Sequence, residues 1–181
     1  MSIFLKTHAP LLSVCTALLF GFAAHGQYAN KSLGISAGYT KFSLQGESLE
    51  YRVPLALDGS LYIENGFEAV IHFPVMLLKE NDRGLIRGKQ FIGLSPSVGV
   101  RYVFLEEAFR PYAGLDLSFL FFFGNVDLGS LYVGPSPSVG FDYFLTEGVS
   151  LGMKAQFNWY LSLNKPPENS LGFTAGVNLW F

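Results

Sequence analysis

Cysteine is almost absent from this 181-residue chain, because the only one is Cys15. Without a second cysteine no disulfide framework can hold the fold, and no cysteine cluster can bind a metal. Charged residues are also scarce, at 14% of the chain, and the net charge of -2 offers no basic excess for nucleic acid. A stable domain of this composition depends on the pairing of its secondary-structure elements alone.

Long apolar runs are missing as well. Beyond residue 26 the sequence has no stretch of about 18 apolar residues, the length that a membrane-spanning helix needs. Half of the residues are nevertheless hydrophobic, which is a high share for a soluble domain with so few charges. An apolar chain without a membrane helix favours a membrane β-barrel, whose strands show alternation instead of long runs.

Residues 1–26 have the features of a secretory signal peptide. A short segment with Lys6 precedes the apolar run "LLSVCTALLFGFAA", and "AHG" supplies small residues at its end. We expect cleavage after about Gly26, which leaves 27–181 as one exported barrel domain. The segment "LSVC" leaves a lipoprotein interpretation open, although Val14 is bulky where such a signal needs a small residue.

Alternation of apolar and small or polar residues runs through the rest of the chain. Side chains alternate sides along a strand, so a period of two indicates strands and not helices. The sequence therefore predicts an all-β fold, an eight-stranded antiparallel up-and-down transmembrane β-barrel. Its strands are expected at about 32–43, 49–63, 67–79, 90–104, 111–123, 131–145, 149–162 and 170–181.

The predicted connections differ between the two ends of the barrel. Glu64-Asn65-Gly66 and Thr146-Glu147-Gly148 are expected to form three-residue turns, with the glycine at positive φ. These turns would place Ile63 opposite Phe67 and Leu145 opposite Val149. The other end carries longer and more polar loops, among them "ENDRGLIRGK". Short turns at one end and long loops at the other are typical of outer-membrane barrels.

The two faces of the predicted strands differ in polarity. One face is apolar and free of charge, and we expect it to contact lipid. The other face is rich in Gly and Ser, which suits a narrow lumen, and it carries Arg52, Asp58, Glu68, His72, Arg101, Asp116, Asp142 and Lys154. The alternative is a soluble lipocalin-like carrier, in which the apolar face would be the core.

A ten-residue pattern occurs twice. "SPSVGVRYVF" starts at Ser95 and "SPSVGFDYFL" starts at Ser136, which indicates duplication of a hairpin. Gly99 and Gly140 are expected to leave room for neighbouring side chains. Each copy has a proline inside a strand, where it removes one ladder donor. We expect a local bulge or wide spot at Pro96 and at Pro137.

An eight-stranded barrel is just wide enough for its side chains to fill the interior, so charges inside must pair. The sequence therefore predicts a filled polar lumen and not a pore. The alternative is a gated conduit or a proton-sensitive switch at His72. The expected neighbours are Arg101 with Asp116, Asp142 with Lys154, and Asp58 with His72.

The chain ends in "GFTAGVNLWF", with aromatic or aliphatic residues at every second position back from the terminus. Phe173, Leu179 and Phe181 in this segment resemble the C-terminal signal that the barrel assembly machinery reads. With the signal peptide and the eight strands, the chain resembles the small OmpA/OmpX-type outer-membrane β-barrels. This resemblance implies a monomer in the outer membrane of a Gram-negative bacterium, surrounded by lipids and lipopolysaccharide.

The expected function is non-enzymatic, a structural or surface-interaction role in the cell envelope. The alternative, a lipid A- or phospholipid-modifying enzyme of the same fold, resembles proteins that use a His–Ser pair with a polar partner. The mature chain has one histidine, His72, and Pro74 stands two residues from it where a serine would be needed. No cofactor or metal is predicted. Arg83, Arg87 and Lys89 in one loop are candidates for contact with glycolipid phosphates.

Overall fold

The computed structural model describes residues 30–44, 47–78, 92–105, 107–123, 131–162 and 165–181. Within these ranges no helix is long and apolar enough to span a membrane. The strands are β1 (Lys31–Leu44), β2 (Glu47–Glu64), β3 (Phe67–Leu78), β4 (Ile92–Leu94), β5 (Ser97–Val103), β6 (Phe109–Phe123), β7 (Tyr132–Thr146), β8 (Val149–Ser162) and β9 (Lys165–Trp180).

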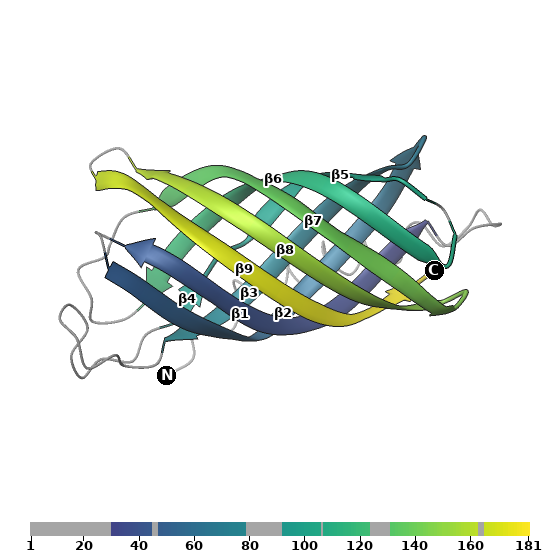
Figure 1. Ribbon diagram of the computed structural model, residues 1–181, viewed down its shortest axis with the longest axis horizontal. Coiled ribbons are helices and arrows are strands. Elements are labelled where there is room, and N and C mark those ends of the chain that lie inside the picture. The colour runs from purple at the N-terminus through teal and green to yellow at the C-terminus, as the bar shows by residue number, and fades with distance from the viewer. Residues whose placement is uncertain (1–29, 45–46, 79–91, 106, 124–130, 163–164) are drawn as a thin grey trace, which may run out of the picture.

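All strand pairs are antiparallel, and they close into a ring (Figure 1). β1 pairs with β2 on one side and with β9 on the other, and β2 also pairs with β3. β4 and β5 lie in turn between β3 and β6, so that they share one position in the ring. The nine strands therefore fill eight positions, and the predicted eight-stranded up-and-down barrel is confirmed.

Two tight turns close hairpins at the end of the barrel where β9 ends. Asn65 and Gly66 both have positive φ, 51° and 82°, which fits a two-residue type I′ turn between Glu64 and Phe67. The predicted three-residue turn is wrong, because a register shift takes up Ile63 as an extra residue. The Glu147–Gly148 hairpin has the same two-residue length and a similar shift, but the expected positive φ at Gly148 is wrong.

The outward face of the barrel is apolar. Its large hydrophobic side chains are 37% to 59% exposed, which in water would leave a very large apolar surface uncovered. Aromatic residues are exposed near both ends of the strands, for example Tyr102 and Tyr143 at the turn end and Trp159 at the loop end. This arrangement fits a bilayer, and the alternative of a soluble carrier with an apolar core is wrong because the apolar face points away from the interior.

A β-bulge in β2 changes which side chains point outward. Ser36 pairs with Ala56 while Gly38 pairs with Val53, so that β2 has one extra residue at this point. The pairing of β2 with β3 also leaves one extra residue on β2, between Arg52 and Leu55. The bulge contains Pro54, which lacks the N–H that a regular ladder needs. As a result Val53 points inward and is only 2% exposed, whereas Arg52 is exposed on the outward face. The expectation that Arg52 faces the lumen is therefore wrong.

The prolines of the repeat open the ladder without a bulge. Leu94 pairs with Phe121 and Ser97 with Ser118, which is one unbroken register on either side of Pro96. The carbonyl of Pro96 still accepts a bond from the Phe119 N–H, with 2.8 Å between N and O. Likewise residues 134–137 pair with β6 but leave the ladder with β8, whose register is unchanged beyond them. The ladder is therefore interrupted at each proline, and the expectation of a bulge there is wrong.

Candidate functional site

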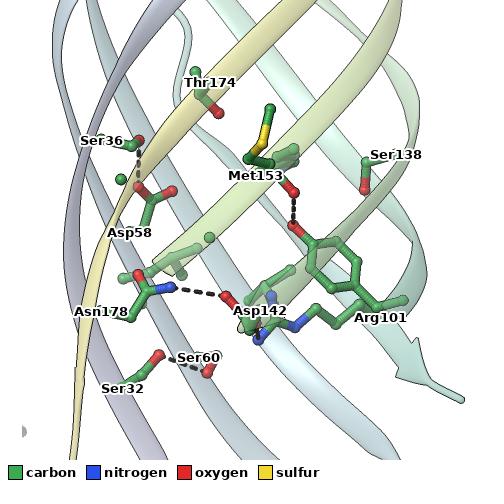
Figure 2. Close-up of a pocket in the computed structure, with 17 residues that line it drawn as sticks. Ser32, Ser36, Asp58, Ser60, Arg101, Ser138, Asp142, Met153, Thr174 and Asn178 are labelled. Atoms are coloured by element: carbon green, nitrogen blue, oxygen red, sulfur yellow. Dashed lines mark hydrogen bonds and ion pairs between the residues drawn. The ribbon is translucent and has the colours of Figure 1, made fainter. Parts of the chain in front are cut away.

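The lumen near the turn end is occupied by a cluster around Arg101 (Figure 2). Its Nη2 lies 2.7 Å from Glu68 Oε2 and 2.9 Å from Asp142 Oδ2, and its Nε donates to the same Glu68 oxygen. The guanidinium also stacks over the ring of Tyr112, with 4.3 Å from Cζ to the ring centroid. Asn178 donates to the other oxygen of Asp142. Both carboxylates are almost fully buried, so the single cation compensates two buried anions.

A second cluster lies further along the lumen, around Asp116. Its Oδ2 receives hydrogen bonds from Lys154 Nζ at 2.9 Å, from Gln156 Nε2 at 3.3 Å and from Ser97 Oγ at 3.4 Å. Asp116 is 2% exposed, so this pairing takes place with little water around it. Charge-assisted bonds of this kind are about twice as strong as those between neutral groups.

Asp58 and His72 form a third unit. The two residues pair across β2 and β3, and His72 Nδ1 lies 2.5 Å from Asp58 Oδ1. Ser36 donates to the second oxygen of Asp58. The structure thus brings Asp58 and His72 together, as the register implied.

The other two expected pairs are not formed. Arg101 stands opposite Gly114, and it reaches Glu68 and Asp142 instead of Asp116. Lys154 reaches Asp116 instead of Asp142. In a barrel this narrow, side chains point towards the axis, so that partners are chosen across the lumen as well as along a hairpin.

Towards the loop end large apolar side chains join the polar ones in the interior. Phe42, Val53, Met76 and Leu120 are all at most 2% exposed, and Phe42 stacks on Tyr160 with ring centroids 6.0 Å apart. The Tyr160 hydroxyl makes a 2.7 Å hydrogen bond with Ser95 Oγ. This layer is absent from the sequence prediction, which described the lumen face as mainly small and polar. Apolar residues at the inward positions Phe42 and Met76 were the available signal.

Two small cavities lie in the lumen among the residues that the structure describes. A cavity of about 60 Å³ lies beside Asp58, Arg101 and Asp142, and one of about 30 Å³ lies beside His72 and Tyr160. Spaces of this size, lined by polar groups, are suited to ordered water molecules. In the described ranges no three Asp, Glu, His or Cys side chains gather as metal ligands.

One row of side chains has the order of a hydrolytic triad. Asp58 pairs with His72, and His72 pairs with Ser97 on the next strand. Sequence reasoning missed Ser97, because the long connection between β3 and β4 hides the register. An acid, a base and a hydroxyl in this order can activate a nucleophile. Here, however, the Ser97 hydroxyl donates to Asp116, and Ser97 is only 6% exposed.

The remaining predicted residues are those of the assembly signal and the three cations of the loop. Phe173, Leu179 and Phe181 all point outward and are more than half exposed. The backbone of Phe181 exchanges hydrogen bonds with Lys31, which holds the terminus in the barrel wall. Arg83, Arg87 and Lys89, like the 1–26 segment, lie outside the described residues.

Comparison with known proteins finds likeness in structure only. No family model and no curated protein matches the sequence. Neisserial surface protein A (NspA) superimposes with a TM-score of 0.70 at 18% identity, over 83% of this chain and 97% of that one. The attachment invasion locus protein Ail of Yersinia pestis gives a TM-score of 0.55 at 13% identity, over 86% of this chain and all of Ail. The outer membrane enzyme PagL gives 0.52 at 15% identity, over 80% of this chain and 97% of PagL. The chain therefore has the fold of the small bacterial outer-membrane β-barrels of the OmpA/OmpX type.

Proposed function

We propose that this protein is a non-enzymatic barrel of the bacterial outer membrane, with a structural or surface-interaction role in the cell envelope. The observation that carries the proposal is the filled lumen. Charged side chains pair across it, apolar side chains pack towards its loop end, and the two lumen cavities among the described residues measure about 60 and 30 Å³. A barrel of this kind is a rigid support and offers neither a channel nor a substrate chamber.

The surface-interaction role has support from one of the similar structures. Ail is described as an attachment invasion locus protein, and one of its structures holds the heparin analogue sucrose octasulfate. For this chain we propose that the loops at the loop end make corresponding contacts with a partner or with lipopolysaccharide. Arg83, Arg87 and Lys89 are the residues proposed to contact the phosphates of that glycolipid.

Export and assembly complete the proposal. The chain would be cleaved after about Gly26 and would enter the outer membrane of a Gram-negative cell as a monomer. The outward series ending in Phe181 would be the segment that the barrel assembly machinery reads. Deletion of Phe181 is expected to lower the amount in the outer membrane while the periplasm still receives the cleaved protein. Unchanged outer-membrane levels would argue against this signal.

The proposal is tested by fractionation, by gel mobility and by conductance. The mature protein should fractionate with the outer membrane and migrate differently before and after boiling in detergent, because a closed barrel has no free edge to unfold from. In planar bilayers it should give no steady conductance. Recovery as a soluble periplasmic protein, or stable channels from the unmodified protein, would refute it.

An enzymatic function is the second candidate, favoured by the Asp58–His72–Ser97 row and by the likeness to PagL. It requires that the purified barrel release fatty acid from phospholipid or lipid A, and that Ser97→Ala abolish the release. We expect no release from either protein, because Ser97 is buried and bonded to Asp116. Release that depends on Ser97 would move the protein to the enzyme class.

A further inference from the structure

The outward wall of the barrel carries an apolar groove of about 350 Å³. It crosses four neighbouring strands, β1, β9, β8 and β7. Ala37 pairs with Ala175, and Ala155 lies on the next strand beside Phe173. These small residues form the floor, while bulkier neighbours stand around them. The walls are Tyr39, Phe141, Met153 and Phe173.

Arg52 stands at one end of the same row of residues. It pairs with Tyr39, which lines the groove, and Tyr39 pairs with Phe173. The row continues through Ala155 to Val139. Because the strands are tilted, a row that steps from β2 to β7 rises from the loop end towards the turn end (Figure 1). Arg52 is thus near the loop end of the groove, and Val139 is in the middle of β7.

An outward arginine is unusual on this wall. It is present because the bulge at Pro54 turns Arg52 from the lumen to the outside. A charge on the lipid face is costly at mid-depth, and the cost falls to about 0–1 kcal/mol near the interface. Among the side chains that the structure describes, none forms a hydrogen bond or ion pair with Arg52. An exposed guanidinium can reach a group outside the protein, and its planar fork matches the oxygens of a phosphate.

We propose that Arg52 and the groove together bind one membrane lipid that has a phosphate in its head group. The guanidinium holds the phosphate at the outer boundary of the bilayer, and one acyl chain lies over Ala37, Ala155 and Ala175. The inference rests on the proposed membrane function, since the groove must face lipid. It differs from the proposed loop contacts, because it uses the wall of the barrel and requires a chain as well as a phosphate.

Native mass spectrometry of the folded protein in detergent tests this site. Phosphatidylglycerol is the probe, dioleoylglycerol supplies chains without phosphate, and inorganic phosphate supplies phosphate without chains. We expect one phosphatidylglycerol to be retained per barrel and neither control to be retained. Arg52→Gln should weaken retention about tenfold, as expected for the loss of one charge-assisted contact. Retention by Arg52→Lys should lie between that of the unmodified protein and that of Arg52→Gln, because lysine keeps the charge but loses the planar fork of the guanidinium.

Filling the groove gives an independent variant. Ala155→Phe should weaken retention about as much as Arg52→Gln. Ala69→Leu, on the outward face of β3 away from the groove, is the matched control and should change nothing. Equal retention by Arg52→Gln and the unmodified protein, equal binding of dioleoylglycerol, or equal loss in Ala69→Leu would each overturn the site. Mobility of each unboiled variant reports folding, so a failed barrel is distinguished from an absent lipid site.

Discussion

Arg101 and Asp142 occupy equivalent positions in the two repeated segments, and they form an ion pair with 2.9 Å between Nη2 and Oδ2. Their strands, β5 and β7, are separated by β6, from which Tyr112 stacks on the guanidinium. The single change of charge between the copies thus makes the duplicated segments complementary to each other. Two arginines or two aspartates at these positions would repel each other in the lumen.

Removal of Arg101 is the first test of this network. Arg101→Ala would leave the buried carboxylates of Glu68 and Asp142 without their cation, which costs about 3–5 kcal/mol in comparable buried pairs. The free energy of unfolding in lipid vesicles, measured by urea titration, should fall by that amount. Arg110→Ala, which removes a cation stacked on Phe144 at the barrel end, should have a smaller effect. Equal losses of unfolding free energy in the two variants would mean that the buried ion pairs of Arg101 do not stabilise the barrel more than a contact at its end.

The glycines of the repeat allow a second test. A Cβ at Gly99 would lie 2.4 Å from Asp116 Oδ1, and one at Gly140 would lie 2.2 Å from the carbonyl oxygen of Met153. Gly99→Ala and Gly140→Ala should each lower the free energy of unfolding by about 1–3 kcal/mol, the usual cost of overpacking. At Gly148 the nearest atom would be 3.6 Å away, so Gly148→Ala is the matched control. Tolerance of alanine at both repeat positions would contradict the close strand contact.

The orientation of β5 is tested by a charge on its outward face. Val100 is 48% exposed and lies beside Ala69 and Leu115. Val100→Arg should cost about 2–4 kcal/mol near the middle of the bilayer, and less if the position is close to an interface. The measurement is again urea unfolding in vesicles. A harmless Val100→Arg would show that this face does not contact hydrocarbon.

The bulge at Pro54 reverses the orientation that a regular strand would give to residues 52 and 53, and this can be tested by labelling. Single-cysteine variants at positions 52 and 53 should differ in reaction with a lipid-soluble maleimide, and Cys15 lies in the predicted signal peptide and should not interfere. Arg52→Cys should react, because position 52 faces outward, and Val53→Cys should be protected in the lumen. Strong labelling at 53 with protection at 52 would mean that the strand is regular.

Most strand positions follow from the sequence because one face must be apolar wherever lipid covers it. The same reasoning failed at Pro54 for a physical reason. In this part of β2 every second residue is aromatic or aliphatic, namely Tyr51, Val53, Leu55 and Leu57. The alternating pattern therefore continues through the bulge without a visible break. Only the proline signals that a ladder donor is missing there.

The lumen pairs were harder to predict than the strands. Glu68 stands directly opposite Arg101. The register of β3 with β5 could not be predicted, because a long connection joins these strands and its length does not determine which residues pair. Tight turns do fix register, which is why Asp58 and His72 were expected together. Contacts across the lumen, such as Lys154 with Asp116, depend on the diameter and tilt of the closed barrel.

Oxygen accessibility along β5 tests the central claim most directly. Single spin labels at each position from 97 to 103, in protein folded into vesicles, report contact with hydrocarbon, where oxygen is concentrated. We expect high accessibility at 98, 100 and 102 and low accessibility at 97, 99, 101 and 103, in keeping with the outward Val98, Val100 and Tyr102. A flat profile, or high values at the inward positions instead, would contradict a lipid-embedded barrel with a filled polar lumen.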